Sequence, residues 1–240
     1  MLESELLSTT SRQSLPKALQ VTEMLVREIA SGRLADGERL PPERRMAADL
    51  NIAVGTLRRA LANLEEQGLL KRVQGSGNYV CAQKDIKSIY AFFRLERLQG
   101  GGLPSAEIVD VLRLLKPGDM PFIGSGRYAH RIRRTRYLNE MPVALEEIWL
   151  DSRFTDRLKK SDLSESLYLY YKTELGLIIS GIEDKVSVSR LPGWGDLSLK
   201  IEPGDTCGYV ERIGFSQDGT QAEYSRTWFD QTVAQYTVRQ

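Results

Sequence analysis

The fold of the N-terminal part is decided by one stretch, LPPERRMAADLNIAVGTLRRALANLEEQGLLKRVQGSGNYV (residues 40–80). Prolines and an acidic residue at its start favour a short helix over residues 41–50. From residue 54 to residue 67 apolar side chains recur three to four positions apart, which predicts a second helix that ends at Gly68. Strand candidates at residues 69–74 and 78–80 flank Gly75-Ser76-Gly77, whose glycines suit a tight hairpin turn.

A further amphipathic helix precedes this stretch. Apolar residues between Ala18 and Ile29 share one stripe, and Gly32 stands where a left-handed C-terminal cap is usual. Three helices followed by a hairpin is the order of a winged helix-turn-helix. In that arrangement the exposed N-terminal half of the third helix can enter the major groove of DNA, while the hairpin reaches along the backbone or the minor groove.

The charge of the chain is balanced overall and uneven locally. The 240 residues carry 33 basic and 32 acidic side chains, a net charge of +1, which argues against a protein that coats nucleic acid by bulk charge. Residues 39–72 alone hold seven basic and four acidic side chains, a surplus of three positive charges. The length favours two domains.

Several classes of protein are disfavoured by composition. No apolar run approaches the roughly 18 residues of a membrane helix, and residues 1–17 lack the apolar core of a signal peptide. We therefore expect a cytoplasmic protein with no membrane partner. Two cysteines and one histidine fall short of a disulfide scaffold or a structural zinc site, so we expect no metal and no cofactor.

The second half of the chain has a different pattern. From Ile89 onward apolar residues alternate between breaks rich in Gly, Pro, Asn and Asp, which predicts antiparallel sheet, with helical signals only near residues 151–158 and 164–175. We predict four segments: a flexible tail over residues 1–14, a winged helix-turn-helix domain over 15–81, a linker over 82–88 and a second domain over 89–240. The fold class is α+β.

The first domain resembles the DNA-binding domain of GntR-family transcriptional regulators. The residues that carry the resemblance lie in the same order over residues 15–81: IASGRL (29–34), LPPER (40–44), GTLRRAL (55–61), EQGLL (66–70) and QGSG (74–77). The second half is similar to the UTRA effector-binding domain of the HutC branch, which is chorismate lyase-like. Its matching residues are IRRTR (132–136), PVALEE (142–147), SLY (166–168), ERI (211–213) and DG (218–219) with Glu223.

The resemblance implies which residues contact DNA. The family's contacts fall on Glu43, Arg44, Thr56, Arg58, Gln74 and Gly75, and Arg59 leaves the same outer half of the third helix. The alternative for the arginines is an ordinary solvated helical face. One departure matters: Val54-Gly55 replaces an Arg-Thr pair found in many members, which removes a side chain able to bind guanine. We therefore expect a different operator, with the contacts to the DNA backbone retained.

A second group of candidate residues lies in the segment from Ala129 to Leu138. Strict alternation places Arg134 and Arg136 on the same face as Ile132 and Leu138, which should point inward. An inward arginine needs an anionic partner, because an unpaired buried charge costs several kcal/mol. Glu146 could be that partner within the protein. Alternatively, the guanidinium donors could hold a phosphate or carboxylate of a ligand.

The resemblance favours the ligand. The family's pocket uses an Arg-x-Arg pair, matched by Arg134 and Arg136, and a serine matched by Ser166 near a predicted helix N-terminus that favours anions. Residues that match Glu146 and Glu223 face the polar body of the ligand in that family. Tyr168, Tyr170 and Tyr171 are interpreted as packing or dimer surface rather than a platform for stacking.

These features together predict a transcriptional regulator rather than an enzyme. We expect a repressor that binds a pseudo-palindromic operator in double-stranded DNA as a homodimer and is released by a small anionic metabolite effector. Two alternatives stay open at this stage. The lyase-like half could be a small-molecule enzyme, although fold does not establish chemistry, or the protein could bind DNA without any ligand, with its arginines paired internally.

Overall fold

The computed structural model describes residues 16–82, 92–163, 166–195 and 199–238. The chain divides into two compact units, one built on residues 105–137 and 141–234 and the other on residues 15–104, 138–140 and 235–240. The predicted tail and the predicted linker, apart from residue 82, lie outside the described residues.

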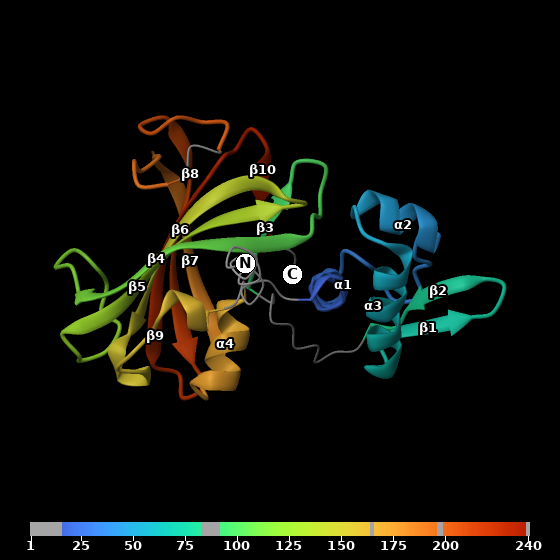
Figure 1. The fold of residues 1–240 in the computed structure, drawn as a ribbon, viewed down its shortest axis with the longest axis horizontal. Coiled ribbons are helices and arrows are strands. Elements are labelled where there is room, and N and C mark those ends of the chain that lie inside the picture. Colours follow the sequence, from blue (N-terminus) through green and yellow to red (C-terminus); the bar gives the residue numbers. More distant parts are fainter. Residues whose placement is uncertain (1–15, 83–91, 164–165, 196–198, 239–240) are drawn as a thin grey trace, which may run out of the picture. The chain divides into compact units, whose positions relative to one another are not determined.

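The helical unit has the predicted winged helix-turn-helix order (Figure 1). Its elements are α1 (Lys17–Ala30), α2 (Glu43–Asp49), α3 (Val54–Glu66), β1 (Leu70–Val73) and β2 (Gly77–Val80). The predicted inward residues of α3 are at most 1% exposed and form one core with α1 and the hairpin: Leu57, Ala60, Leu61 and Leu64. Gly32 and Gly68 both adopt φ of +70°, the left-handed conformation expected where each helix ends.

The second unit is built on one six-stranded sheet, as the alternation predicted. Its strands are β4 (Pro104–Leu115), β5 (Tyr128–Leu138), β6 (Met141–Asp151), β7 (Ile179–Arg190), β8 (Thr206–Ser216) and β9 (Gln221–Phe229), in the spatial order β4-β5-β6-β9-β8-β7. The pairs β6–β9, β7–β8 and β8–β9 are antiparallel. Two short strands, β3 (Leu95–Arg97) and β10 (Ala234–Tyr236), form a separate two-stranded sheet.

The helical signals in this half are only partly confirmed. The signal near residues 164–175 corresponds to α4 (Leu167–Glu174), but the signal near residues 151–158 yields only a 3-10 turn, Ser152–Phe154, with a second at Lys160–Asp162. Asp151 caps this turn, because its side chain accepts the N–H of Arg153 at 2.8 Å. The chain returns to extended backbone at Thr155, with φ of −162° and ψ of 142°, so the turn does not continue into a helix.

The strand register sorts the charged side chains onto two faces of the sheet. Residues opposite each other in an antiparallel pair point to the same side. Leu150 of β6 lies opposite Glu223 of β9, and Arg212 of β8 lies opposite both Ser225 of β9 and Asp184 of β7. Between its bulges the sheet therefore carries the even-numbered residues of β6, β7 and β8 and the odd-numbered residues of β9 on one face, and the contact between Arg134 and Glu146 places Arg134 of β5 on the same face. We call it the α4 face, because α4 contacts Glu223 there.

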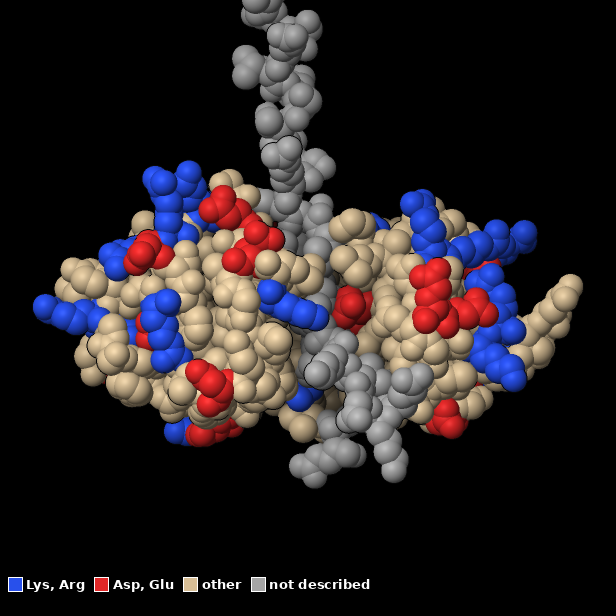
Figure 2. Space-filling model, turned by 90° about the horizontal axis from the view of Figure 1, so that it is seen from below, with Lys and Arg blue, Asp and Glu red and all other residues tan. Residues whose placement is uncertain are grey.

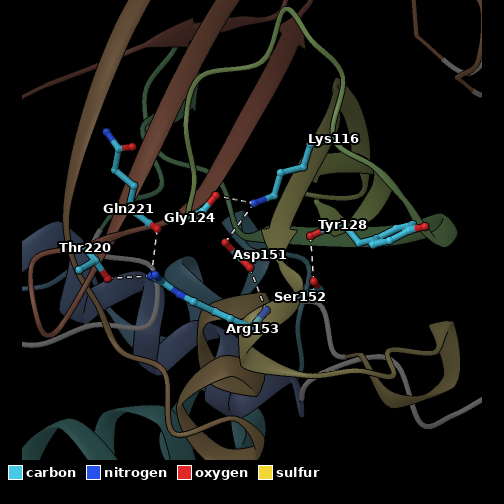
Figure 3. A network of polar contacts seen from close by, with 8 residues as sticks. All are labelled: Lys116, Gly124, Tyr128, Asp151, Ser152, Arg153, Thr220 and Gln221. Atoms are coloured by element: carbon cyan, nitrogen blue, oxygen red, sulfur yellow. Dashed lines mark hydrogen bonds and ion pairs between the residues drawn. The ribbon is translucent and has the colours of Figure 1, made fainter. Parts of the chain in front are cut away.

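The end of β6 is fixed to the sheet by a buried ion pair (Figure 3). Lys116 Nζ donates to the Gly124 carbonyl at 3.0 Å and to Asp151 Oδ2 at 3.1 Å, and the Asp151 side chain is fully buried. Position 124 requires glycine, because its φ is +108° and because a Cβ there would collide with the Asp151 carboxylate. Arg153 donates to Thr220 Oγ1 at 2.7 Å and to the Gln221 carbonyl at 3.0 Å, which joins the next turn to the start of β9.

Replacement of Asp151 by alanine should therefore cost about 3 kcal/mol or more of unfolding free energy, because the Lys116 ammonium is left buried without its carboxylate. The matched control is Asp119→Ala, which removes an acidic partner of Arg226 that is 73% exposed and should cost less than about 1 kcal/mol. Urea unfolding of both variants measures the difference. Equal losses would contradict the distinction between a buried and an exposed pair.

Candidate functional site

The helical unit presents the predicted DNA-contacting residues on one exposed surface. Arg58 and Arg59 leave the outer side of α3 and are exposed, Thr56 is half-buried in its first turn, and Arg44 is exposed on α2. Figure 2 shows basic side chains gathered on one side of the unit at the right of the view. This surface has the charge and exposure that contact with a DNA backbone requires.

Glu43 is an acidic residue on this basic surface, and it positions one of its arginines. Its Oε2 accepts from Arg58 Nε at 2.7 Å, across from α2 to α3. The hydrogen bond from Arg58 is the largest influence that holds the pKa of Glu43 below its usual range, with the positive charges of Arg58 and Arg72 acting in the same direction against partial burial. Glu43 therefore stays ionised and keeps the Arg58 guanidinium in one orientation.

The hairpin completes the surface. Gln74 and Gly75 lie exposed in the turn between β1 and β2, and Gly75 has φ of +73°. The turn, the segment before α2, and Arg58 line a groove of about 620 Å³. Two of its lining arginines, Arg39 and Arg72, were missed by the sequence analysis, because their position on the hairpin depends on strand pairing that no motif records.

The predicted ligand residues meet on the α4 face of the other unit. Arg134 and Arg136 of β5 are 7% and 4% exposed, as the alternation predicted. Arg134 Nε donates to Glu146 Oε2 of β6 at 2.5 Å. Although burial works against ionisation, the positive charges of Arg134 and Arg136 hold the pKa of Glu146 below its usual range. This contact is the internal pair that the sequence left open as an alternative for Arg134.

Glu223 lies in a different environment on the same face. Its two carboxylate oxygens accept one hydrogen bond each, from Tyr168 at 3.0 Å and from Tyr171 at 2.8 Å. Burial is the dominant influence and raises the pKa of Glu223, with the negative charge of Glu146 acting in the same direction. The two tyrosines of α4 thus point inward. Tyr171 is completely buried, in agreement with the packing role expected for it.

Ser166 lies directly before α4 as its N-cap. The Ser166 Oγ accepts from the Leu169 N–H at 3.3 Å, and the residue is 4% exposed. The predicted helix start is therefore real. Ser166 begins α4, the helix whose tyrosines contact Glu223. Arg134, Glu146 and Glu223 therefore lie on the face of the sheet that α4 contacts.

Sequence reasoning missed one charged pair on this face. Arg212 Nε and Nη2 donate to the two carboxylate oxygens of Asp184 at 2.6 and 2.8 Å, a bidentate contact between β8 and β7. The signal was present as the ERI match, but its pairing with Asp184 depends on register. Arg212 and Asp184 therefore add a second charged pair to the face that holds Arg134, Arg136, Glu146 and Glu223. Among the described residues no cluster of His, Cys, Asp and Glu could hold a metal ion.

Comparisons with known proteins follow the same division of the chain. The model for bacterial regulatory proteins of the gntR family matches residues 17–80, and the UTRA domain model matches residues 120–233. The chain is 55% identical over 226 residues to the HTH-type transcriptional regulator SmoD of Agrobacterium fabrum, which covers 94% of this chain and 97% of SmoD.

Two further relatives are more distant. The mannosyl-D-glycerate transport/metabolism system repressor MngR of Escherichia coli is 26% identical over 234 residues, covering 93% of this chain and 95% of MngR. The crystal structure of YydK, described as a possible transcriptional regulator of Bacillus subtilis, shares the fold with a TM-score of 0.53 at 21% identity, covering 94% of this chain and 100% of YydK. No helix among the described residues is long and apolar enough to cross a membrane.

The winged helix, the antiparallel sheet and the match to SmoD over nearly the whole chain all indicate the same family. This chain belongs to the GntR family of transcriptional regulators and carries a UTRA domain in its second half.

Proposed function

We propose that this regulator is a cytoplasmic repressor that binds a pseudo-palindromic operator as a homodimer and is released by a small anionic effector. The observation that carries the proposal is the α4 face, where arginines and carboxylates from separate strands meet under one helix in a chain that also has a DNA-binding unit. Such a face can recognise a ligand that combines an anionic group with hydrogen-bond donors.

The DNA-binding part of the proposal rests on the exposed surface of α3 and the hairpin. One helix and one hairpin contact few base pairs, whereas a two-fold dimer doubles the half-site and fixes the spacing between the halves. Gly55 is exposed at the start of α3 and has no side chain that could donate a hydrogen bond to a base. Arg58, held by Glu43, is then the nearest guanidinium on the helix that can reach a base edge or a phosphate.

The effector part rests on the mixture of cationic and acidic side chains on the α4 face. Arg134, Arg136 and the N-terminus of α4 favour an anion, and Glu146 and Glu223 accept hydrogen bonds from hydroxyl or amino groups. MngR, whose name ties it to mannosyl-D-glycerate, offers an example of a related regulator associated with a compound that has both a carboxylate and sugar hydroxyls. We infer a sugar phosphate or a sugar acid for this chain.

A second candidate function is DNA binding without a ligand. The 2.5 Å contact between Arg134 and Glu146 favours it, because that arginine already has an anionic partner. Calorimetry of the full chain with sugar phosphates and sugar acids separates the two candidates. Binding of a compound that also releases the operator supports the first, whereas operator binding that no such compound affects supports the second.

Replacement of Arg58 by alanine should weaken operator binding. If Arg58 reads a base edge, the loss is about 1–3 kcal/mol and discrimination among sequences at one position relaxes. If Arg58 contacts a phosphate, the dependence of affinity on salt falls instead. Gel-shift titrations at several salt concentrations measure both quantities. Arg157→Ala, which removes an exposed arginine of the other unit, is the control, and an Arg58 variant that binds as that control does would exclude Arg58 from the interface.

Replacement of Arg136 by alanine should weaken effector binding by more than about 1.5 kcal/mol, since charge-assisted hydrogen bonds contribute about 1.5–3 kcal/mol. Operator binding should persist, so the variant resists induction. Arg131→Ala is the matched control, because Arg131 lies on the opposite face of β5 and pairs with Asp110 at 3.0 Å. Calorimetry with an identified effector compares the two. Equal affinities in both variants would show that Arg136 is structural.

The two carboxyls of the α4 face should affect stability with opposite signs as pH changes. The raised pKa of Glu223 gives stability that is fully present below the ordinary value of 4.5 and is lost as pH rises through the raised value. The lowered pKa of Glu146 gives stability that is present above 4.5 and lost as pH falls through the lowered value.

Urea unfolding of Glu223→Gln and Glu146→Gln from pH 3 to pH 8 tests these signs. The unfolding free energy of Glu223→Gln should fall less than that of the parent as pH rises. The unfolding free energy of Glu146→Gln should fall less than that of the parent as pH is lowered. Glu202→Gln, at an exposed turn, is the control for removal of a carboxyl. Identical pH profiles for the parent and both variants would contradict the assignment.

A further inference from the structure

The hairpin of the helical unit has a third strand-like segment that the winged helix pattern did not predict. Residues 37–40 run beside β2 and bond to it at three points. The Gly37 N–H donates to the Val80 carbonyl, the Val80 N–H donates to the Glu38 carbonyl, and the Leu40 N–H donates to the Asn78 carbonyl, each at 2.9 Å. An antiparallel bridge joins Arg39 to Tyr79 between these bonds. The backbone of Arg39 is therefore fixed to the hairpin.

This pairing decides where the Arg39 side chain lies. Tyr79 is opposite Lys71 of β1 on one side and opposite Arg39 on the other. Opposed residues share a face, so Lys71, Tyr79 and Arg39 form one row across the three segments. Leu40 and Val80 point the other way into the core, at 5% and 2% exposure. The row therefore lies on the outer face of the hairpin, and both of its cations are exposed.

Gly77 leaves room on this face for the arginine. A Cβ at Gly77 would lie 3.1 Å from Arg39 Nε and 3.6 Å from Arg39 Nη2, closer than ordinary van der Waals contact for the first atom. The Nε–Nη2 side of the Arg39 guanidinium thus faces the bare Cα of Gly77. Next to it, Ser76 Oγ and Tyr79 OH are 2.7 Å apart, which ties the turn to the same row.

The charges around Arg39 differ from those around Arg58. Arg58 is paired with Glu43 at 2.7 Å, whereas no carboxylate among the described residues lies within ion-pair distance of Arg39. Both arginines line the groove that separates the hairpin turn from α3, together with Arg72. Arg39 thus offers its guanidinium to a partner outside the protein, beside the hairpin turn.

We propose that Arg39 binds a phosphate of the DNA backbone and, with Lys71, forms a second backbone contact on the outer face of the hairpin. This inference rests on the proposed binding of an operator. An exposed guanidinium with no carboxylate of the described residues within ion-pair distance keeps its positive charge for phosphate oxygens outside the protein. Its contact fixes how the hairpin lies on the duplex and carries no sequence information.

The test is a salt titration of DNA binding by the full chain with Arg39→Ala, Arg39→Lys and the exposed control Arg157→Ala. Each is titrated with an operator fragment selected by the parent from a genomic pool and with a scrambled duplex of equal length. We expect Arg39→Ala to weaken binding to both duplexes by about tenfold. We also expect it to reduce the magnitude of the slope of log affinity against log salt by about 1. Arg39→Lys keeps the charge and should keep most of the slope.

Several outcomes would overturn the proposal. An Arg39→Ala variant with the slope and affinity of Arg157→Ala would show that Arg39 only packs on the turn. A change in the ratio between operator and scrambled duplex, at constant slope, would mean that Arg39 reads bases. If inorganic phosphate weakens DNA binding by the parent more than chloride does at equal ionic strength, and Arg39→Ala removes that difference, Arg39 belongs to a site for the free anion rather than to a contact with the DNA backbone. If the parent selects no fragment, the proposed function fails first, and this inference fails with it.

Discussion

The arrangement of the second unit depends on the pairing of charges inside a sheet. Arginine at positions 134 and 136 of a strand whose neighbours at 132 and 138 are completely buried must enter the interior, and a buried guanidinium without an anion costs several kcal/mol. The sheet meets this constraint by register. Glu146 on the neighbouring strand faces Arg134, and Asp184 faces Arg212 across β7 and β8. A slip of one residue in any of these strands would turn the partners to opposite faces.

The same pairing gives the face its chemical contrast. Glu146 is surrounded by guanidinium groups and is stabilised as a carboxylate, whereas Glu223 accepts two neutral tyrosine hydroxyls and its ionised form is disfavoured by burial. One end of the face therefore has fixed charges of both signs, and the other has an acceptor whose charge depends on pH. The proposed anionic ligand would compete with Glu146 for Arg134.

The helical unit uses charged residues differently, at its surface. Glu43 orients Arg58 with little burial, and Arg39 lies against a glycine with no acidic partner among the described residues. The side chains of Val54 and Gly55 at the start of α3 offer no donor to bases, so the proposed contacts of this surface are mainly with the DNA backbone, and salt should weaken them. A chain with a net charge of only +1 can bind DNA in this way because its surplus of basic side chains is concentrated in residues 39–72.

Much of this organisation was determined by the sequence alone. The apolar periodicity of α3, the left-handed glycines after α1 and α3, and the alternation in β5 are local properties, because each depends on backbone geometry over a few residues. They predicted the winged helix, the antiparallel sheet and the inward direction of Arg134 and Arg136. Local signals failed near residues 151–158, where the side chain of Asp151 closes a 3-10 turn in place of a helix.

Only the tertiary structure decided which charges meet. The pairing of Arg134 with Glu146, of Arg212 with Asp184 and of Glu223 with two tyrosines joins residues up to 55 positions apart. No local pattern encodes such distances, because the partner of a buried charge is set by strand order and register. The same holds for Arg39, which the sequence places in a turn before α2 and which hydrogen bonds to β2 fix on the face of the hairpin.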